Sequence, residues 1–293
     1  MTPLLLFFVL TFIISWIFFI SAAAISGSTD PSSAPAIVST LVRLVGVFTP
    51  ALVALMLTAR AEGRAGIRAL LSRIGEFPAA ARWYVFAFGF MATIKLSAAV
   101  LHRVMTGGWP AFGLDSVVLM FAATIFSTPS QAGEEIGWRG YALPRLAAWL
   151  GLAPASIVLG VVWAVWHLPF FLMPGGDTYR QSFVVYLISV TALSVALAFL
   201  YWRTNGSLLM TMLMHAAINN TKDIVPSAEA VATSPFTLSA SLMAWLTAAL
   251  LWICAIYFLF RMREGTLRTD GSDSGRGGAD GKNRHRMLQT EAG

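Results

Sequence analysis

The sequence has few charged residues and a single cysteine, and both shortages limit the kind of protein it encodes. Only 12% of its 293 residues are Asp, Glu, Lys or Arg, whereas soluble chains carry about 25%. Hydrophobic residues make up 57% of the chain, more than one water-facing domain of this length can bury. This composition excludes a soluble domain, a nucleic-acid-binding domain and disorder as descriptions of the whole chain. One cysteine, Cys254, excludes a disulfide scaffold.

Long apolar stretches predict an all-α, polytopic membrane protein, a bundle of about eight transmembrane helices. A bilayer core of about 30 Å is crossed by roughly 20 apolar helical residues. Stretches of this kind cover residues 3–24, 36–58, 83–101, 116–143, 153–172, 182–202, 207–221 and 236–260. The seventh is short and polar at its end. The fourth contains Pro129, which predicts a kink.

The loop charges predict how the bundle is oriented, because cytoplasmic loops are enriched in Lys and Arg. The loop after the second span and the segment after the eighth both carry many cations, among them Arg64, Arg68, Arg261 and Arg263. An even number of spans separates these two regions, so both are expected on the same, cytoplasmic side. The same parity places the N-terminus inside. We expect an integral protein of a bacterial cell membrane with both termini cytoplasmic.

The two ends of the chain allow further predictions. The first span ends in Ala22-Ala23-Ala24, which resembles a signal-peptide cleavage region. It lacks a basic n-region and its apolar run is long for a signal peptide, so we favour a retained helix. After residue 263 the sequence has few apolar residues, which predicts a disordered cytoplasmic tail over 264–293. Residues 1–263 are expected to form one transmembrane domain.

Ionisable groups inside these spans are the first candidates for a functional site, because each costs several kcal/mol in a bilayer. They are Arg43, Lys95, Glu134, Glu135, Arg139, His167 and His215. Counted from the inner ends of their spans, Glu134, His167 and His215 lie at depths of roughly 12–21 Å. Their similar depth predicts one shared polar chamber.

The glutamate pair predicts two different roles for its members. Neighbouring residues on a helix point about 100° apart, so the two carboxylates do not share a face. Glu135 and Arg139 have i,i+4 spacing, which predicts an ion pair. Glu134 is then left without a partner on its own helix and suits a general base or acid. The alternative is that both glutamates lie at a helix end and face water.

Each histidine shares a helix face with a residue four positions away. Trp163 precedes His167 by one turn, and Asn219 follows His215 by one turn. Either histidine could instead be a packing residue that forms a hydrogen bond between helices.

In combination these elements resemble the CAAX protease and bacteriocin-processing (CPBP, or Abi) family of intramembrane endopeptidases. That family has a glutamate pair with Arg four residues after the second Glu, then Phe-x-x-x-His, then His-x-x-x-Asn. In this sequence the elements are Glu134-Glu135-x-x-x-Arg139, Trp163-x-x-x-His167 and His215-x-x-x-Asn219. They lie within residues 130–220. Trp replaces the usual Phe and keeps an aromatic wall.

The resemblance implies hydrolysis of peptide bonds near the C-terminus of membrane-associated or prenylated proteins, in CAAX-type or bacteriocin processing. Glu134 and His167 would activate water, and His215 and Asn219 would stabilise the oxyanion. Glu135, Arg139 and Trp163 would support these catalytic groups. The same Glu134, His167 and His215 could alternatively hold a divalent metal such as zinc. The expected partners are a peptide or membrane-protein substrate and the bilayer, with no nucleic acid.

A different class of function is also compatible with buried ionisable groups. A proton-coupled transporter, or a non-catalytic bacteriocin-immunity or scaffold protein, would use them as a relay or as structural pairs. No inverted repeat is visible to favour transport. The motifs of site-two, aspartyl and serine intramembrane proteases are absent from the sequence.

Overall fold

The computed structural model describes residues 3–25, 33–173, 178–226 and 234–263, and all regular secondary structure in these ranges is helical. Within them, six helical segments are long and apolar enough to cross a membrane. These are α1 (Pro3–Ile25), Ala34–Gly75, α3 (Arg82–Thr106), Leu152–Leu172, α9 (Phe183–Arg203) and α11 (Leu242–Met262). The predicted all-α membrane fold is confirmed. The predicted tail, 264–293, lies outside the described residues.

The interruption predicted at Pro129 is present, but the fourth predicted span, 116–143, is divided into short segments of different helical type. α4 (Val117–Ser127) ends before a 3₁₀ turn, Thr128–Gln131, that contains Pro129. One α-helical turn follows, α5 (Ala132–Glu135), and the chain then widens into a π-helix, Ile136–Ala142. α6 (Leu143–Leu150) continues beyond the predicted end. Proline has no amide hydrogen to donate, so the regular helix cannot pass through it unchanged.

Other helix boundaries also differ from the predicted spans. α2 (Ala34–Ser72) continues past the predicted end at residue 58 through a kink at Gly63, where φ is 64°. α7 (Leu152–Trp166) stops at His167 and is followed by the short α8 (Pro169–Leu172). α10 (Leu208–Thr221) has 14 residues, about 21 Å of helix, which is shorter than the bilayer core.

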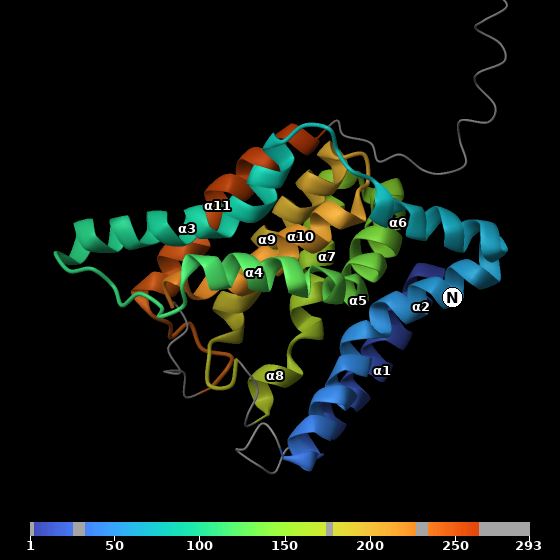
Figure 1. The fold of residues 1–293 in the computed structure, drawn as a ribbon, viewed down its shortest axis with the longest axis horizontal. Helices are drawn as coiled ribbons and strands as arrows, with labels where there is room; N and C mark the ends of the chain where they lie inside the picture. Colours follow the sequence, from blue (N-terminus) through green and yellow to red (C-terminus); the bar gives the residue numbers. More distant parts are fainter. Residues whose placement is uncertain (1–2, 26–32, 174–177, 227–233, 264–293) are drawn as a thin grey trace, which may run out of the picture.

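The helices form two sides with a central layer between them. α1 and α2 lie antiparallel along one side, and α3 and α11 lie on the opposite side (Figure 1). α7, α9 and α10 occupy the space between, and α9 packs against both α7 and α11. The segment from α4 to α6 runs alongside α2 and α10. Its central part, residues 133–143, is buried, whereas α4 keeps an exposed face.

Connections at one end of the bundle are hydrogen-bonded to each other. The amide of Phe183, at the start of α9, donates to the carbonyl of Pro235 at 2.8 Å. The amide of Gly113, between α3 and α4, donates to the carbonyl of Ile224 at 3.0 Å. The connections before α4, before α9 and before α11 therefore lie together at one end.

Close backbone contact fixes the glutamate-bearing segment against α2. A Cβ at Gly137 would lie only 2.6 Å from Cβ of Pro50 and 2.7 Å from its carbonyl group. A Cβ at Gly133 would lie 3.0 Å from the ring of Phe48. Backbone atoms cannot move aside as a flexible side chain can, so glycine at 137 permits this approach. The residue before Glu134 is thus held directly against Phe48 of α2.

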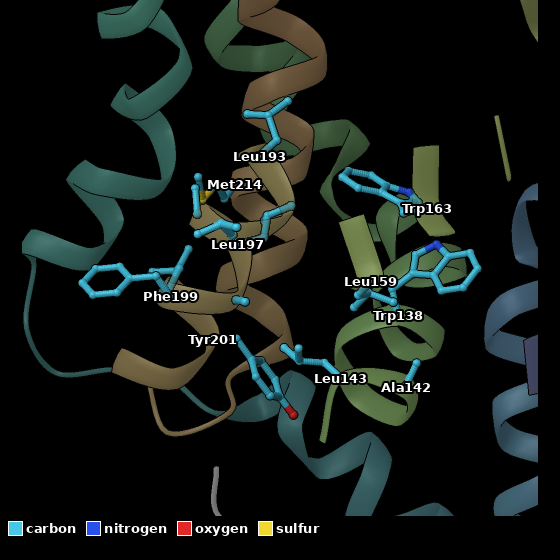
Figure 2. Packing of buried hydrophobic residues seen from close by; sticks show 14 of the residues in the cluster. Trp138, Ala142, Leu143, Leu159, Trp163, Leu193, Leu197, Phe199, Tyr201 and Met214 are labelled. Atoms are coloured by element: carbon cyan, nitrogen blue, oxygen red, sulfur yellow. The ribbon is translucent and has the colours of Figure 1, made fainter. Parts of the chain in front are cut away.

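Aromatic and aliphatic side chains fill the space beneath this segment. Figure 2 shows Trp138 and Trp163 near each other, with Met214 and Leu197 across from them. Trp138 also packs edge-to-face against Phe7 of α1, with ring centroids 5.7 Å apart. The buried apolar layer therefore joins the first helix to the helices that carry the candidate site.

Candidate active site

The two glutamates lie where helix geometry changes. Glu134 and Glu135 end the single turn of α5, and the π-helix begins at the next residue. Every residue of that π-helix is buried. π-helical turns are rare and occur frequently at functional sites, since the extra residue shifts which side chains share a face. The local backbone thus directs Glu134 and Glu135 toward different partners.

Glu135 is the anchor of a buried charge network. Its Oε1 accepts a hydrogen bond from Arg139 at 2.8 Å, the predicted i,i+4 ion pair, and both side chains are fully buried. The same oxygen lies 2.9 Å from Nδ1 of His215 on α10. Glu135 therefore joins the π-helical segment to α10 and fixes the position of one imidazole.

Glu134 points to a different helix. Its Oε2 accepts a hydrogen bond from Nε1 of Trp163 on α7 at 2.7 Å. Glu134 is buried, with 7% of its surface accessible. Glu134 is thus directed into the bundle, where a neutral donor on another helix holds its carboxylate.

Trp163 stands at the centre of the site. Its ring packs edge-to-face against His167 and His215, with centroid separations of 5.7 and 5.3 Å. The guanidinium of Arg139 lies over the same ring, 4.4 Å from its centroid. One indole therefore contacts both histidines and Arg139 while its N–H holds Glu134. The predicted aromatic wall has a second role as a hydrogen-bond donor to the candidate base.

The hydrogen bonds of the histidines indicate which ring nitrogens remain available. Nδ1 of His167 lies 2.9 Å from the carbonyl of Trp163, and a carbonyl only accepts, so Nδ1 is assigned the proton. Nδ1 of His215 faces the Glu135 carboxylate, which is also an acceptor. Both rings therefore use Nδ1 for support and leave Nε2 for chemistry.

A cavity of about 840 Å³ gives access to these groups. Trp163, His167, His215 and Asn219 all line it. Asn219 is exposed on its wall, one turn after His215. The cavity is large enough to hold several residues of a peptide. The structure thus brings Trp163 and both histidines of the predicted site together with Asn219 around one cavity. Glu134 lies behind this wall, where it accepts the hydrogen bond of Trp163.

A metal site was the alternative use of Glu134, His167 and His215. In the described part of the chain, no group of three or more His, Cys, Asp or Glu side chains has the arrangement to hold a metal ion. The supporting hydrogen bonds of the two histidines use Nδ1 and leave Nε2 of each ring available to a ligand. Metal dependence therefore stays a prediction for experiment.

Two features of the site were not found from the sequence. The bond between Glu135 and His215 joins residues 80 positions apart, and no local spacing signals it. Tyr186 of α9 also lines the cavity, with its ring 5.6 Å from that of His167. A single tyrosine in an apolar helix carries no motif, so only the fold could show its position.

Comparisons with known proteins relate the part of the chain that carries this site to peptidases. A family model described as type II CAAX prenyl endopeptidase Rce1-like matches residues 109–221, the range that contains Glu134, Glu135, Arg139, Trp163, His167, His215 and Asn219. The CAAX prenyl protease 2 of Methanococcus maripaludis is 22% identical over 241 residues, covering 75% of this chain and 84% of that protein. Both matches name a peptidase, and neither favours the transporter or scaffold alternative.

Proposed function

We propose that this chain is an intramembrane endopeptidase of the CPBP family, in which Glu134 and His167 activate water for peptide-bond hydrolysis inside the bundle; its similarity to CAAX prenyl endopeptidases supports this. The observation that carries this proposal is the hydrogen bond from Trp163 to Glu134, formed by an indole that contacts both imidazoles. It places a carboxylate and two histidines around one point, at the wall of a cavity. A general base must be within hydrogen-bond reach of the water it deprotonates.

The proposed reaction uses protein groups alone. Glu134, assisted by Nε2 of His167, removes a proton from water as the oxygen attacks the peptide carbonyl carbon. The resulting oxyanion accepts hydrogen bonds from Nε2–H of protonated His215 and from the amide of Asn219. Glu135 supports His215 in this form through Nδ1. When the C–N bond breaks, the proton held by Glu134 passes to the leaving amine.

The substrate we propose is the C-terminal tail of a membrane-associated peptide or protein. The relative is named for CAAX prenyl proteolysis, and a CAAX tail has three residues after a prenylated cysteine. A bilayer-embedded cavity is suited to a tail whose upstream part is held in or near lipid. Processing of a bacteriocin precursor would use the same chemistry on a different tail.

Cleavage of defined peptides tests this function. The purified full chain, in lipid nanodiscs, is incubated with a prenylated CAAX peptide, its unprenylated counterpart and a bacteriocin-type precursor, and products are mapped by mass spectrometry. We expect one internal cut near the C-terminus of at least one peptide, at a rate unchanged by a chelator. Absence of any cut contradicts the proposal. A rate lost on chelation and restored by zinc contradicts the metal-free chemistry alone.

The distribution of charge supports an orientation with both termini cytoplasmic in a cell membrane. The hydroxyl of Ser207 donates to the carbonyl of Glu76 at 2.5 Å, so the connections before α3 and α10 share the end opposite the α9 and α11 starts. Cations are concentrated at that end, among described residues Arg60, Arg64, Arg68, Arg73, Arg82, Arg145, Arg203, Arg261 and Arg263. The positive-inside rule assigns it to the cytoplasm.

Cysteine labelling checks the orientation, since Cys254 is the one native cysteine. In a Cys254→Ser background, Ser239→Cys marks the cavity rim and Glu76→Cys marks the cation-rich end; both positions are exposed. We expect an impermeant maleimide to label Ser239→Cys in intact cells and Glu76→Cys only after permeabilisation. A substrate then enters from the outer side or from the bilayer. The reverse labelling pattern contradicts the orientation.

A further inference from the structure

Arg43 is an intramembrane cation that the proposed chemistry does not use. Arg43 lies in the membrane-crossing part of α2, is half-buried and lines the same cavity as the two histidines. It forms no hydrogen bond or ion pair with any residue in the described ranges. A cation at this depth is costly, and it marks a ligand or substrate site whose partner should be an anion.

The other cations of the cavity differ from Arg43 in their surroundings. Lys95 and Lys222 also line it, but the carboxylate of Asp223 lies among them and acts electrostatically on Lys95. Arg43 stands on α2 beside the apolar residues Leu44 and Val47. An apolar wall that ends in an arginine matches a peptide tail with apolar side chains and a terminal carboxylate.

The distance from Arg43 to the catalytic groups fits a short tail. Arg43 precedes Phe48 by five residues on α2, a displacement of about 7.5 Å along the helix. Phe48 is the residue that packs against Gly133, next to Glu134. Three extended residues span about 10 Å, so a carboxylate three residues beyond a bond held at Glu134 comes within reach of the arginine side chain.

We propose that Arg43 binds the C-terminal carboxylate of the substrate and thereby selects which peptide bond lies beside Glu134. The guanidinium offers paired N–H donors that match a carboxylate, an interaction stronger than a neutral hydrogen bond. Arg43 would thereby fix the number of residues between the cleaved bond and the free C-terminus of the substrate. This inference rests on the proposed peptidase function and adds its requirement for a free C-terminus.

Matched peptides test the carboxylate requirement without any variant. Three versions of one cleavable peptide are compared: the free acid, the C-terminal carboxamide and the acid extended by two residues. We expect the wild-type protein in nanodiscs to cleave the free acid with a kcat/KM roughly 10- to 100-fold above that of the amide. The extended acid should be cleaved slowly, or be cut at a bond shifted two residues toward its new end.

Variants then assign the preference to Arg43. Arg43→Gln should lower kcat/KM for the free acid to the level of the amide and leave the amide rate unchanged, whereas Arg43→Lys should keep part of the preference. Arg60→Gln is the matched control, because Arg60 is exposed on the same helix and does not line the cavity; it should behave as wild type.

The outcomes separate this inference from the proposed function. If the wild-type protein cuts none of the three peptides, the peptidase function and this inference both fail. If it cuts acid and amide equally, or if Arg43→Gln slows both substrates alike, the peptidase function stands and the carboxylate role is overturned. Equal slowing of the acid and the amide by Arg43→Gln is also the result expected if Arg43 bound a lipid headgroup phosphate.

Discussion

Replacing Glu134 with glutamine is expected to lower kcat/KM for peptide cleavage about 10³-fold, the range that removal of a general base produces. Glutamine has nearly the same shape, and its amide oxygen can still accept the N–H of Trp163, now 2.7 Å from the carboxylate. The fold should therefore survive while the proton acceptor is lost. Cleavage assays paired with thermal melting measure the two effects separately. Glu62→Gln, an exposed carboxylate at the other end of α2, is the control and should keep full activity.

The partnership of Glu134 with His167 gives this result a second check. Groups that act on one water molecule are not additive when removed. His167→Ala should reduce cleavage strongly. The Glu134→Gln/His167→Ala double variant should cleave no more than about threefold more slowly than the less active of the two single variants. Losses that multiply in the double variant would show that the two residues act independently.

Replacing Arg139 with alanine is expected to destabilise the protein by about 3–5 kcal/mol, because it leaves a buried carboxylate without its cation. Arg139 and Glu135 are both fully buried, 2.8 Å apart, and the guanidinium also covers the ring of Trp163. Loss of folded protein should therefore exceed any selective loss of chemistry. Thermal melting of the purified variant in nanodiscs, compared with its specific activity, makes the distinction.

The chain offers a matched control for this substitution. Arg145 pairs with Glu62 at 3.2 Å, but their side chains are 34% and 51% exposed, and exposed pairs contribute about 0–1 kcal/mol. Arg145→Ala should therefore melt close to wild type. Adding Glu135→Gln to Arg139→Ala removes the stranded charge and should recover part of the stability. An Arg139→Ala variant that melts normally and has no activity would contradict the structural role.

The fold was predictable where long apolar runs of sequence identify membrane-spanning helices. Six spans were evident because lipid requires long runs of apolar residues, and those runs stand out in composition. The broken path from Ser127 to Ala142 was not predictable, because proline marks an interruption without specifying the 3₁₀ and π turns that follow. The extension of α2 through charged residues was missed because they lie at the water-facing end, where hydropathy no longer identifies a helix.

The site was predictable where spacing along one helix determines contact. The Glu135–Arg139 pair follows from i,i+4 geometry alone, and it is present. The contact of Trp163 with Glu134 and that of Glu135 with His215 join different helices. Depth in the membrane placed these side chains at one level, but only packing decides which faces meet. The position of Arg43 in the cavity wall also depends on packing between helices, because α2 approaches the glutamate-bearing segment closely at Gly133 and Gly137.

The central claim is that Glu134 and His167 deliver water, and isotope transfer in a single turnover tests it most directly. Excess enzyme cleaves a peptide in water enriched in ¹⁸O, and mass spectrometry reads the new carboxyl group of the upstream product. The account predicts one ¹⁸O atom there from the first turnover and none in Glu134. A first-turnover product carrying only ¹⁶O at the new carboxyl group, with ¹⁸O in the Glu134 side chain, would contradict it by showing that the carboxylate attacks the peptide itself.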